Sequence, residues 1–309
     1  MNGIVPCKLE HRRLTLSVMP PDSTPQFILS VQHNGMSDSV FDGLFVQRKE
    51  TAWNDIGTLA LAMSIYRAAF PHVTVVYNQI PRRFVDTNRD PEDPRLFRRA
   101  FEDQALKSYF FDFHETLETT IKESAGRHGF RTCLLDIHGF AEQPPYAPEG
   151  GFHVILGTRN RGSIVTSIDA EFSRTTLTPG WLDLDRKLSG VLCTKGLSVF
   201  CPDSEPIFQR EWLNRVQKNY PQLDAFPRGN DTIDDPEADM EAGVLRPPPM
   251  SDWYDGGYLI GRFVHGSKRL AAAIQVEIAS GLRKKNPEEN VQRSSLVDSI
   301  SEFIRETCS

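Results

Sequence analysis

The chain has 309 residues, of which 39% are apolar and 25% are charged. Lysine and arginine together number 35 against 41 aspartates and glutamates, so the formal net charge is -6. This length allows one or two domains with a sizeable core. Because the balance is acidic, no global basic field is available to recruit nucleic acid or an anionic membrane, and we expect neither as a partner.

The beginning of the chain and its cysteines favour a cytoplasmic protein. Lys8, Glu10 and two arginines come before any apolar signal region could form, and no apolar run approaches the ~20 residues that span a bilayer. The 5 cysteines are spaced singly, which disfavours a disulfide framework and a thiolate zinc site. We therefore expect a cytoplasmic chain in which any metal is held by histidine and carboxylate.

The first third of the chain alternates short β-branched runs with helical stretches. Two strands are predicted over 13–19 and 26–31, separated by a turn-prone segment, and we expect them to pair with each other. Apolar residues at helical spacing predict a helix over 55–70, and a buried strand follows at 73–77. A long helix is expected over 94–127. This alternation is typical of an α/β or mixed architecture.

Later apolar runs of strand length occur at 132–137, 152–156, 271–278 and, less cleanly, 190–200. Two proline-rich stretches, 141–151 and 221–255, are expected to be loop insertions in a single domain spanning 1–309. Ligands of open α/β sheets bind beyond the carboxyl ends of the strands. Polar clusters at those ends are therefore the first candidates for chemistry.

Two histidines occupy such positions. His33 directly follows a predicted strand, and His138 belongs to an Asp-x-His step at the end of another. Neutral imidazole is a good zinc ligand, and a neighbouring carboxylate such as Asp136 can fix its tautomer. Asp136 shares a strand face with His138 and could itself be a ligand instead. For either histidine alone, a hydrogen-bonded, half-buried imidazole is the more common alternative.

The order of the motifs resembles that of the N-formylglutamate amidohydrolases, whose members share a fold with the zinc carboxypeptidases. The Arg-x-Val-Asp-x-Asn-Arg string at 83–89 is the most specific of them. The matching segments are His33 to Gly35, Asp55 to Thr58, Arg83 to Arg89, Asp136 to His138, Leu156 to Arg159, Gly256 to Leu259 and Ile274 to Ile278. The resemblance implies a three-layer α/β/α sandwich around a mixed, mostly parallel sheet.

The resemblance also implies a metal centre. His33, Asp55 and His138 match the family positions that would hold Zn²⁺ or another divalent metal, with one position open for water. Zinc carboxypeptidases take their carboxylate ligand from His-x-x-Glu, and here that position is Met36. The metal model therefore depends on Asp55, with Asp38 as a weaker alternative. A helix N-cap is the competing interpretation of Asp55.

Glu277 and Arg83 are the catalytic candidates that the resemblance provides. Glu277 matches the glutamate that acts as general base and acid in the related carboxypeptidases, a role that suits a carboxylate at the end of a buried strand. An ordinary ion pair is the alternative. Arg83 would polarise the scissile carbonyl or hold a second carboxylate.

Four further residues are candidates for substrate binding. Asn88 and Arg89 resemble the pair that grips a substrate carboxylate in this fold, since a planar guanidinium gives two parallel hydrogen bonds. Plain salt bridges are the alternative for such arginines. Arg159, in a glycine-containing turn, is a second anion-binding candidate, and Gly257 would let the backbone approach the substrate. His114, in the long predicted helix, is interpreted as structural.

These observations lead us to expect a zinc-dependent amidohydrolase that cleaves the amide bond of a small N-acyl, N-formyl-like amino acid. The expected partner is a small carboxylate-bearing amide, and the sequence leaves the oligomeric state open. One alternative is a peptidase or deacylase of the same fold that acts on a different amide. The other is a binding protein of this fold that does not catalyse a reaction.

Overall fold

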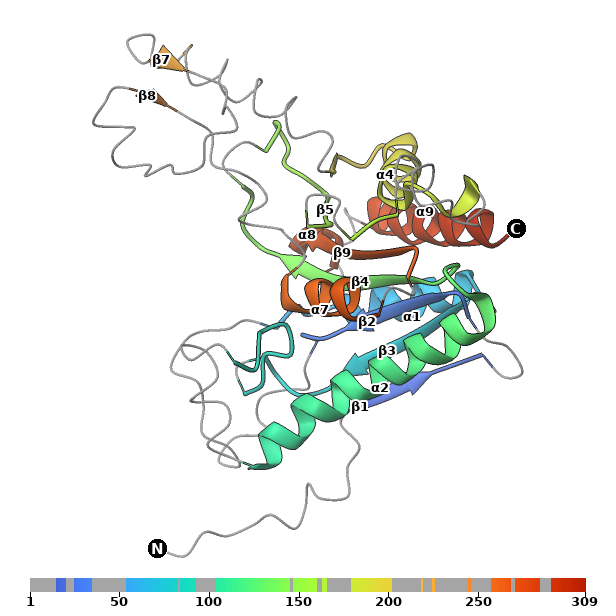
Figure 1. Ribbon diagram of the computed structural model, residues 1–309. Coiled ribbons are helices and arrows are strands. Elements are labelled where there is room, and N and C mark those ends of the chain that lie inside the picture. Colours follow the sequence, from blue (N-terminus) through green and yellow to red (C-terminus); the bar gives the residue numbers. More distant parts are fainter. Residues whose placement is uncertain are drawn as a thin grey trace, which may run out of the picture.

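A computed structural model (Figure 1) provides the three-dimensional structure of the chain. It describes residues 15–20, 25–34, 54–82, 84–92, 104–144, 147–159, 163–165, 179–201, 218, 224–225, 244–245, 257–267, 270–283 and 290–309. Arg83, Met36 and Asp38 lie outside these described residues. Most of the predicted 221–255 insertion does so as well.

The described elements alternate strands and helices along the chain. The strands are β1 (Thr15–Val18), β2 (Phe27–Val31), β3 (Val73–Asn78), β4 (Cys133–Phe140), β5 (Val154–Gly157), β6 (Val199–Phe200), β7 (Asp224–Ala225), β8 (Val244–Leu245) and β9 (Ala272–Ala279). The helices are α1 (Thr58–Ala68), α2 (Gln104–His128), the 3₁₀ turn η2 (Pro179–Trp181), α4 (Leu184–Thr194), α7 (Gly257–Ser267), α8 (Ser280–Arg283) and α9 (Asn290–Cys308).

Seven strands form the main sheet, in the order β1-β3-β2-β4-β9-β5-β6. The pairs β2/β3, β2/β4, β4/β9 and β5/β6 are parallel, whereas β1/β3 and β5/β9 are antiparallel. Strands such as β2, β3 and β4 are apolar and buried along almost their whole length, as expected for parallel strands covered on both faces. The predicted α/β fold with a mixed, mostly parallel sheet is confirmed.

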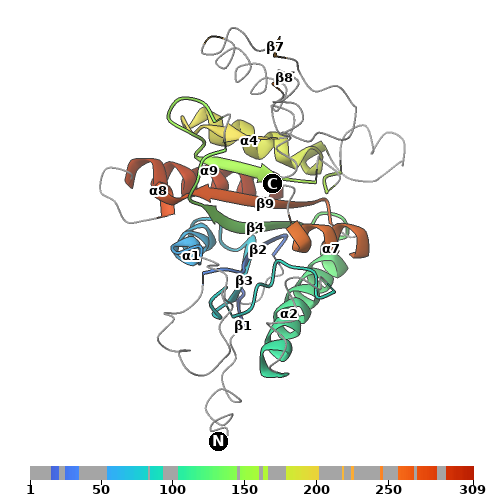
Figure 2. The ribbon, with the colours of Figure 1, turned by 90° about the vertical axis from the view of Figure 1, so that its left-hand side faces the viewer.

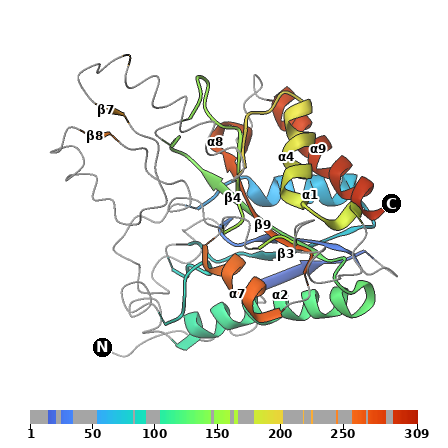
Figure 3. The same cartoon turned by 45° about the horizontal axis from the view of Figure 1, so that its top comes forward.

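Helices cover both faces of this sheet. Helices α1, α4 and α9 lie on one face, while α2 and α7 lie on the other (Figures 1 and 3). On the first face, odd-numbered residues of β2 and β4 such as Leu29 and Leu135 pack in one core cluster with Leu61 and Ile300. The even-numbered Ile28 and Leu134 pack with α2 and α7 in a second cluster. Strand alternation thus produces the three layers.

The prediction that the first two strands pair with each other is wrong. β1 pairs with β3, in antiparallel orientation, and β3 separates it from β2. All five residues of β2 are buried, so this strand needs neighbours on both edges and both faces, whereas Ser17 of β1 is exposed. β1 is therefore the edge strand of the sheet.

The strand predicted over 190–200 is also largely wrong. Helix α4 extends through Thr194, and only the two residues of β6 remain extended. Leu184, Leu188 and Leu192 recur at a spacing of four and are all buried, which places them on one helical face. The other predicted elements are confirmed where the structure describes them, with boundaries that shift by a few residues.

The topology brings the polar strand ends to one region. β2, β4 and β9 are parallel neighbours, so their carboxyl ends lie at the same edge of the sheet. The register pairs Ser30 with Asp136 and His138 with Glu277. Residues in register on parallel neighbours point to the same face of a sheet. Two candidate residues from distant parts of the sequence are therefore side by side.

Among the helices of the described part of the chain, none combines the length and the apolarity that crossing a membrane requires.

Candidate metal centre

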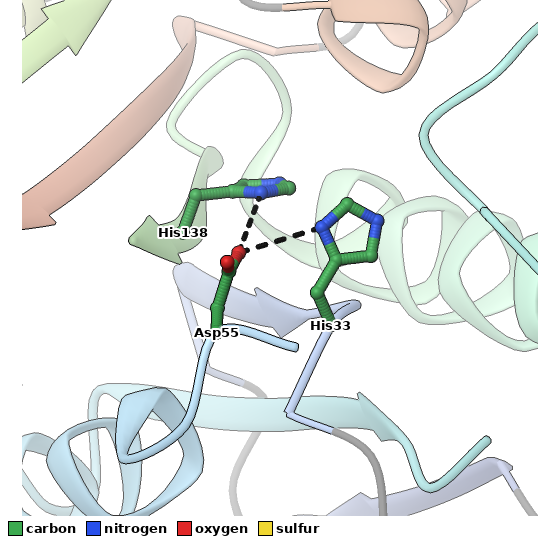
Figure 4. A group of neighbouring side chains, drawn as sticks. All are labelled: His33, Asp55 and His138. Atoms are coloured by element: carbon green, nitrogen blue, oxygen red, sulfur yellow. Dashed lines mark ion pairs between the residues drawn. The ribbon is translucent and has the colours of Figure 1, made fainter. Parts of the chain in front are cut away.

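His33, Asp55 and His138 meet in a buried cluster at this edge of the sheet (Figure 4). One ligand atom from each residue lies within 4.8 Å of the other two. The Nδ1 atom of His33 is 3.4 Å from Asp55 Oδ2, and Nδ1 of His138 is 3.3 Å from the same oxygen. Both imidazoles therefore direct the same ring nitrogen toward a single carboxylate.

Backbone contacts hold Asp55 against the strand that carries His33. The Asp55 amide donates to the His33 carbonyl oxygen over 2.8 Å, and the Thr58 hydroxyl donates to the Asp55 carbonyl oxygen over 2.7 Å. A side chain from another segment caps the N-terminus of α1, because the Leu59 amide donates to Asn34 Oδ1. Asp55 makes no side-chain cap to α1. Its carboxylate is directed to the histidines instead.

Gly57 is required for this turn. Its φ of +93° lies in the left-handed region, and an added Cβ would clash with the Arg283 carbonyl oxygen. We expect Gly57→Ala to lower the free energy of unfolding by at least about 1–2 kcal/mol, because a side chain at positive φ is strained even before the clash. In the part of the chain that the structure describes, no atom lies within 4 Å of a Cβ added at Gly126, within α2. Gly126→Ala should instead stabilise by about 0.5–1 kcal/mol. Urea unfolding of both variants measures the difference.

Two further carboxylates bind the Nε2 atoms of the two histidines, the ring nitrogens that do not face Asp55. Nε2 of His33 donates to Asp86 Oδ1 over 2.9 Å, and Nε2 of His138 donates to Asp136 Oδ2 over 2.8 Å. An ionised carboxylate can only accept, so each Nε2 carries a proton and each Nδ1 can offer a lone pair. This arrangement is typical of metal-binding histidines, whose second nitrogen is oriented by a carboxylate.

Asp136 and Asp86 are themselves anchored. The Ser30 hydroxyl donates to Asp136 Oδ1, and the Gln32 amide donates to Asp136 Oδ2 over 2.7 Å. Asp136 therefore contacts the Nε2 side of the His138 ring, whereas Asp55 contacts the Nδ1 side. This position makes Asp136 a partner of the histidine rather than a third ligand beside Asp55. Asp86 accepts from Arg82 Nε over 3.1 Å.

Electrostatics around the cluster favour a cation. Burial raises the pKa of Asp55, but its contacts with His138 and His33 outweigh burial and lower the pKa below its ordinary value. Burial likewise raises the pKa of Asp86, and His33 and Arg82 lower it well below the ordinary range. For His138, burial lowers the pKa, whereas Asp136 and Asp55 raise it well above its usual value. A buried set of ionised carboxylates thus faces the histidines.

The side chains fit a divalent metal. Among the described residues, Nδ1 of His33 is buried and finds no hydrogen-bond partner, although a buried polar atom is normally satisfied. Two imidazole nitrogens and one carboxylate form a donor set that zinc accepts in catalytic sites, with a further position left for water. The buried cluster could therefore bind a metal ion through His33, Asp55 and His138.

Removing the charge behind His33 should weaken that binding. We expect Asp86→Asn to reduce the affinity for zinc by roughly 10- to 100-fold, the usual effect of losing a carboxylate behind a metal-binding histidine. Asp90, four residues further along, is exposed and accepts from the Glu92 amide. Asp90→Asn is the matched control and should leave the affinity unchanged. Competition with a chelating dye measures both, and equal affinities would contradict the assigned role of Asp86.

Glu277 lies beside this cluster. It is in register with His138 on the neighbouring parallel strand, and the Gln275 amide donates to its Oε1 over 3.0 Å. Burial is the largest influence on this carboxyl and, together with Asp55, raises its pKa to about 7 against the opposing effect of His138. A carboxyl with such a pKa can both take up and release a proton near neutral pH.

Asn88 and Gly257 are in contact with each other. Asn88 Oδ1 accepts from the Leu259 amide over 3.0 Å, so this side chain caps the N-terminus of α7. Gly257 has a φ of +62°, and a Cβ there would lie 2.6 Å from Asn88 Nδ2. The close approach that Gly257 permits in this structure is therefore to Asn88.

The arginine candidates have different surroundings. Nε of Arg89 is 3.4 Å from Asp86 Oδ2, and 47% of the Arg89 side chain is exposed. Arg159, with a φ of +49°, extends its guanidinium to α7, where it occupies the space that a Cβ on Gly261 would need. Arg89 thus contacts the same carboxylate, Asp86, that binds His33, while the Arg159 guanidinium lies against α7. The placement of Arg83 is outside the described residues.

Two residues outside the proposed ligand and substrate set organise the site: Arg283, which the sequence did not indicate, and His114, for which it predicted a structural role. Buried Arg283 donates to the carbonyl oxygens of Ile56, Phe140 and Ile278, which follow closely after Asp55, His138 and Glu277. His114 of α2, which burial leaves with a pKa of about 3, meets the Thr87 carbonyl oxygen through Nε2 over 3.0 Å. It thereby holds the segment that carries Asp86. No local pattern links either residue to the partners it binds.

Comparison with known proteins is informative at the level of structure. No family model matches the sequence, and no curated protein matches it either. The crystal structure of N-formylglutamate amidohydrolase from Ralstonia eutropha JMP134 is similar, with a TM-score of 0.50 and 18% identity, over 94% of this chain and 98% of that one. A gene product of Agrobacterium tumefaciens has a TM-score of 0.50 and 16% identity, over 96% and 94% of the two chains. The chain therefore has the fold of an N-formylglutamate amidohydrolase over nearly its whole length.

Proposed function

We propose that this chain is a metal-dependent hydrolase that cleaves the amide bond of a small N-acyl amino acid or a similar carboxylate-bearing amide. The observation that carries the proposal is the buried His33, Asp55 and His138 cluster, backed by Asp86 and Asp136. The likeness in fold to an amidohydrolase supports the same conclusion.

The ligands in this proposal are Nδ1 of His33, Nδ1 of His138 and the Asp55 carboxylate. A zinc ion bound by them would act as a Lewis acid toward the scissile carbonyl and would lower the pKa of water. Asp86 and Asp136 keep each imidazole in the tautomer that offers Nδ1. Arg283 keeps the three site segments together through their carbonyl oxygens.

Glu277 is the proton carrier. Its carboxylate takes the proton from the attacking water and then delivers it to the nitrogen of the departing amine. The pKa of about 7 supports both steps, because a group that titrates near the working pH both accepts and donates readily. Its position in register with His138 keeps it next to the proposed ligands.

The substrate carboxylate would be bound by Arg89 and Asn88. The Nε of Arg89 contacts Asp86, so the terminal amines of the guanidinium are the donors that a carboxylate would meet. Asn88 uses its oxygen to cap α7 and has Nδ2 as its donor, close to Gly257. In this proposal Arg83 polarises the scissile carbonyl, and Arg159 beside α7 is a further anion contact.

The proposed function is tested with a panel of N-acyl amino acids. We expect zinc-supplemented protein to release the free amino acid from at least one of them, and excess chelator to abolish release until zinc is restored. Elemental analysis of the purified protein should find about one metal ion per chain. Protein that binds no metal would contradict the proposal, as would hydrolysis that persists unchanged in chelator.

A further inference from the structure

Arg283 ends helix α8 and is buried, although no ion pair is recorded for it with any described residue. Each of its three guanidinium nitrogens donates to a backbone carbonyl oxygen instead. The bonds run from Nε to Ile278 over 3.0 Å, from Nη1 to Ile56 over 2.9 Å and from Nη2 to Phe140 over 3.3 Å. Burying a charge is costly unless hydrogen bonds compensate for the lost hydration. These three bonds supply that compensation.

Each of these carbonyl oxygens belongs to a segment that supplies one residue of the candidate site. The pairs are Ile56 with Asp55, Phe140 with His138 and Ile278 with Glu277. The members of a pair are at most two residues apart, which corresponds to about 6.6 Å of extended chain. A shift of one of these carbonyl groups therefore moves the neighbouring site residue as well.

The main sheet fixes two of these three segments relative to each other. β4 and β9 are parallel neighbours, and His138 is in register with Glu277. Asp55 lies outside the strands, in the turn before α1, where its amide donates to the His33 carbonyl oxygen after β2. The guanidinium of Arg283 joins this turn to the ends of β4 and β9. It thus connects Asp55, which strand pairing does not place, with two residues that strand pairing does place.

Two glycines leave room for Arg283. A Cβ added at Gly139 of β4 would clash with the guanidinium, and one added at Gly57 would clash with the Arg283 carbonyl oxygen. The same carbonyl oxygen accepts from Arg293 Nη1 over 3.0 Å. Helix α8 lies on the same side of the sheet as α1, opposite α7 (Figure 2), so Arg283 reaches the strand ends from the side of the Asp55 turn.

The charge of Arg283 suits this position. Burial lowers the pKa of its guanidinium, and the attraction of Asp55 and Glu277 opposes this change. An arginine stays protonated in a protein, so a permanent cation lies near both carboxylates. Because the recorded hydrogen bonds of the guanidinium all go to carbonyl oxygens, the Asp55 carboxylate remains directed to the two histidines.

We infer that Arg283 is a positioning residue of the metal centre, and that it sets the place of the Asp55 carboxylate relative to His138 and Glu277. This inference rests on the ligand set of the proposed function and makes metal affinity depend on a residue outside that set. Metal–ligand distances vary by only about 0.2 Å, so a loosened Asp55 turn weakens binding even when every ligand is present. The planar guanidinium suits the role because its donors have fixed directions, whereas lysine offers a single nitrogen.

The test compares Arg283→Ala and Arg283→Lys with the matched control Arg305→Ala. Arg305 donates from Nη1 to the Ala68 carbonyl oxygen at the other end of α1, so its loss removes the same charge and a similar contact away from the centre. Competition with a chelating dye measures the affinity for zinc. The visible absorption of Co²⁺-loaded protein reports the geometry of the ligands, and circular dichroism reports whether each variant folds.

We expect Arg283→Ala to weaken zinc binding by roughly 10- to 100-fold, as the loss of a residue that orients a ligand does, and to change the Co²⁺ absorption. Arg283→Lys should shift both quantities in the same direction, and Arg305→Ala should change neither. A purely structural role would lower the free energy of unfolding without altering the affinity or the spectrum of folded protein. Full affinity and an unchanged spectrum in either folded Arg283 variant would overturn the inference.

Gly139→Ala provides a second measure, which decides the matter if the Arg283 variants do not fold. It keeps Arg283 but takes the space of the guanidinium, so it should weaken zinc binding and change the Co²⁺ absorption as well. Where Arg283→Ala folds, adding Gly139→Ala to it should reduce the affinity by less than about twofold, because the clash is then absent. Unchanged affinity in Gly139→Ala, or additive losses in the double variant, would overturn the inference.

Hydrolysis of N-acyl amino acids is measured separately. If the protein binds zinc with the expected responses but hydrolyses none of these compounds, the role of Arg283 stands and the proposed function fails. If zinc-dependent hydrolysis occurs and Arg283→Ala keeps full affinity for zinc, the proposed function stands and the role of Arg283 is overturned.

Discussion

Replacing Glu277 by glutamine is expected to reduce kcat by roughly 10²- to 10⁴-fold, the usual contribution of a general acid and base. Glutamine preserves the shape of the side chain and its contact with Gln275, but it cannot carry a proton between water and amine. The ligands themselves are untouched, so the metal content should stay at the level of the unmodified protein. Steady-state kinetics and elemental analysis on the same preparation measure both quantities.

The matched control is Glu115→Gln, on the exposed surface of α2. It removes the same charge from the chain and should leave kcat unchanged. If Glu277→Gln retained full turnover, Glu277 would be excluded as the proton carrier. If it lost the metal together with turnover, Glu277 would be a ligand instead.

Loss of either histidine is expected to have the largest effect on metal binding. His138→Gln removes Nδ1 from the cluster and should lower the affinity for zinc by more than roughly 100-fold, beyond the effect of changing a residue behind a ligand. His33→Gln should do the same. Because Asp55 contacts both rings, each variant also leaves a buried carboxylate with one partner fewer, so the free energy of unfolding should fall as well.

Zinc titration with a chelating dye measures the affinity, and circular dichroism reports whether the fold persists. His72→Ala is the control, since the bonds that the structure records for His72 are made by its backbone. A folded His138→Gln protein that still bound zinc with unchanged affinity would contradict the proposed centre.

The local sequence pattern was sufficient for much of the fold. Strands β2, β3, β4 and β9 are largely apolar runs of the kind that parallel strands require, and α1 follows from its helical spacing. The pattern failed where pairing is a long-range property. Nothing within residues 13–31 indicates that β1 pairs with β3, because an edge strand differs from a central one mainly in its distant neighbours.

For the site, sequence alone indicated which residue types could do the chemistry. His33, His138 and Glu277 each follow or end an apolar run, Asp55 begins the predicted helix over 55–70, and their motif order resembles that of the N-formylglutamate amidohydrolases. The sequence also indicated Asp136 as the carboxylate that orients His138, which the structure confirms, but it did not indicate the other side chains that orient the cluster. Asp86 is 53 residues from His33 along the chain, and Arg283 is 227 residues from Ile56.

The sequence by itself determined the secondary structure of the central strands, the acidic charge and the set of histidines and carboxylates available to a metal. Only the tertiary structure decided that Nδ1 of both histidines faces Asp55, that Asp86 binds Nε2 of His33, and that Arg283 joins the segments that carry Asp55, His138 and Glu277. The physical reason is that hydrogen-bond direction and burial depend on strand order and register, which join segments far apart in the chain.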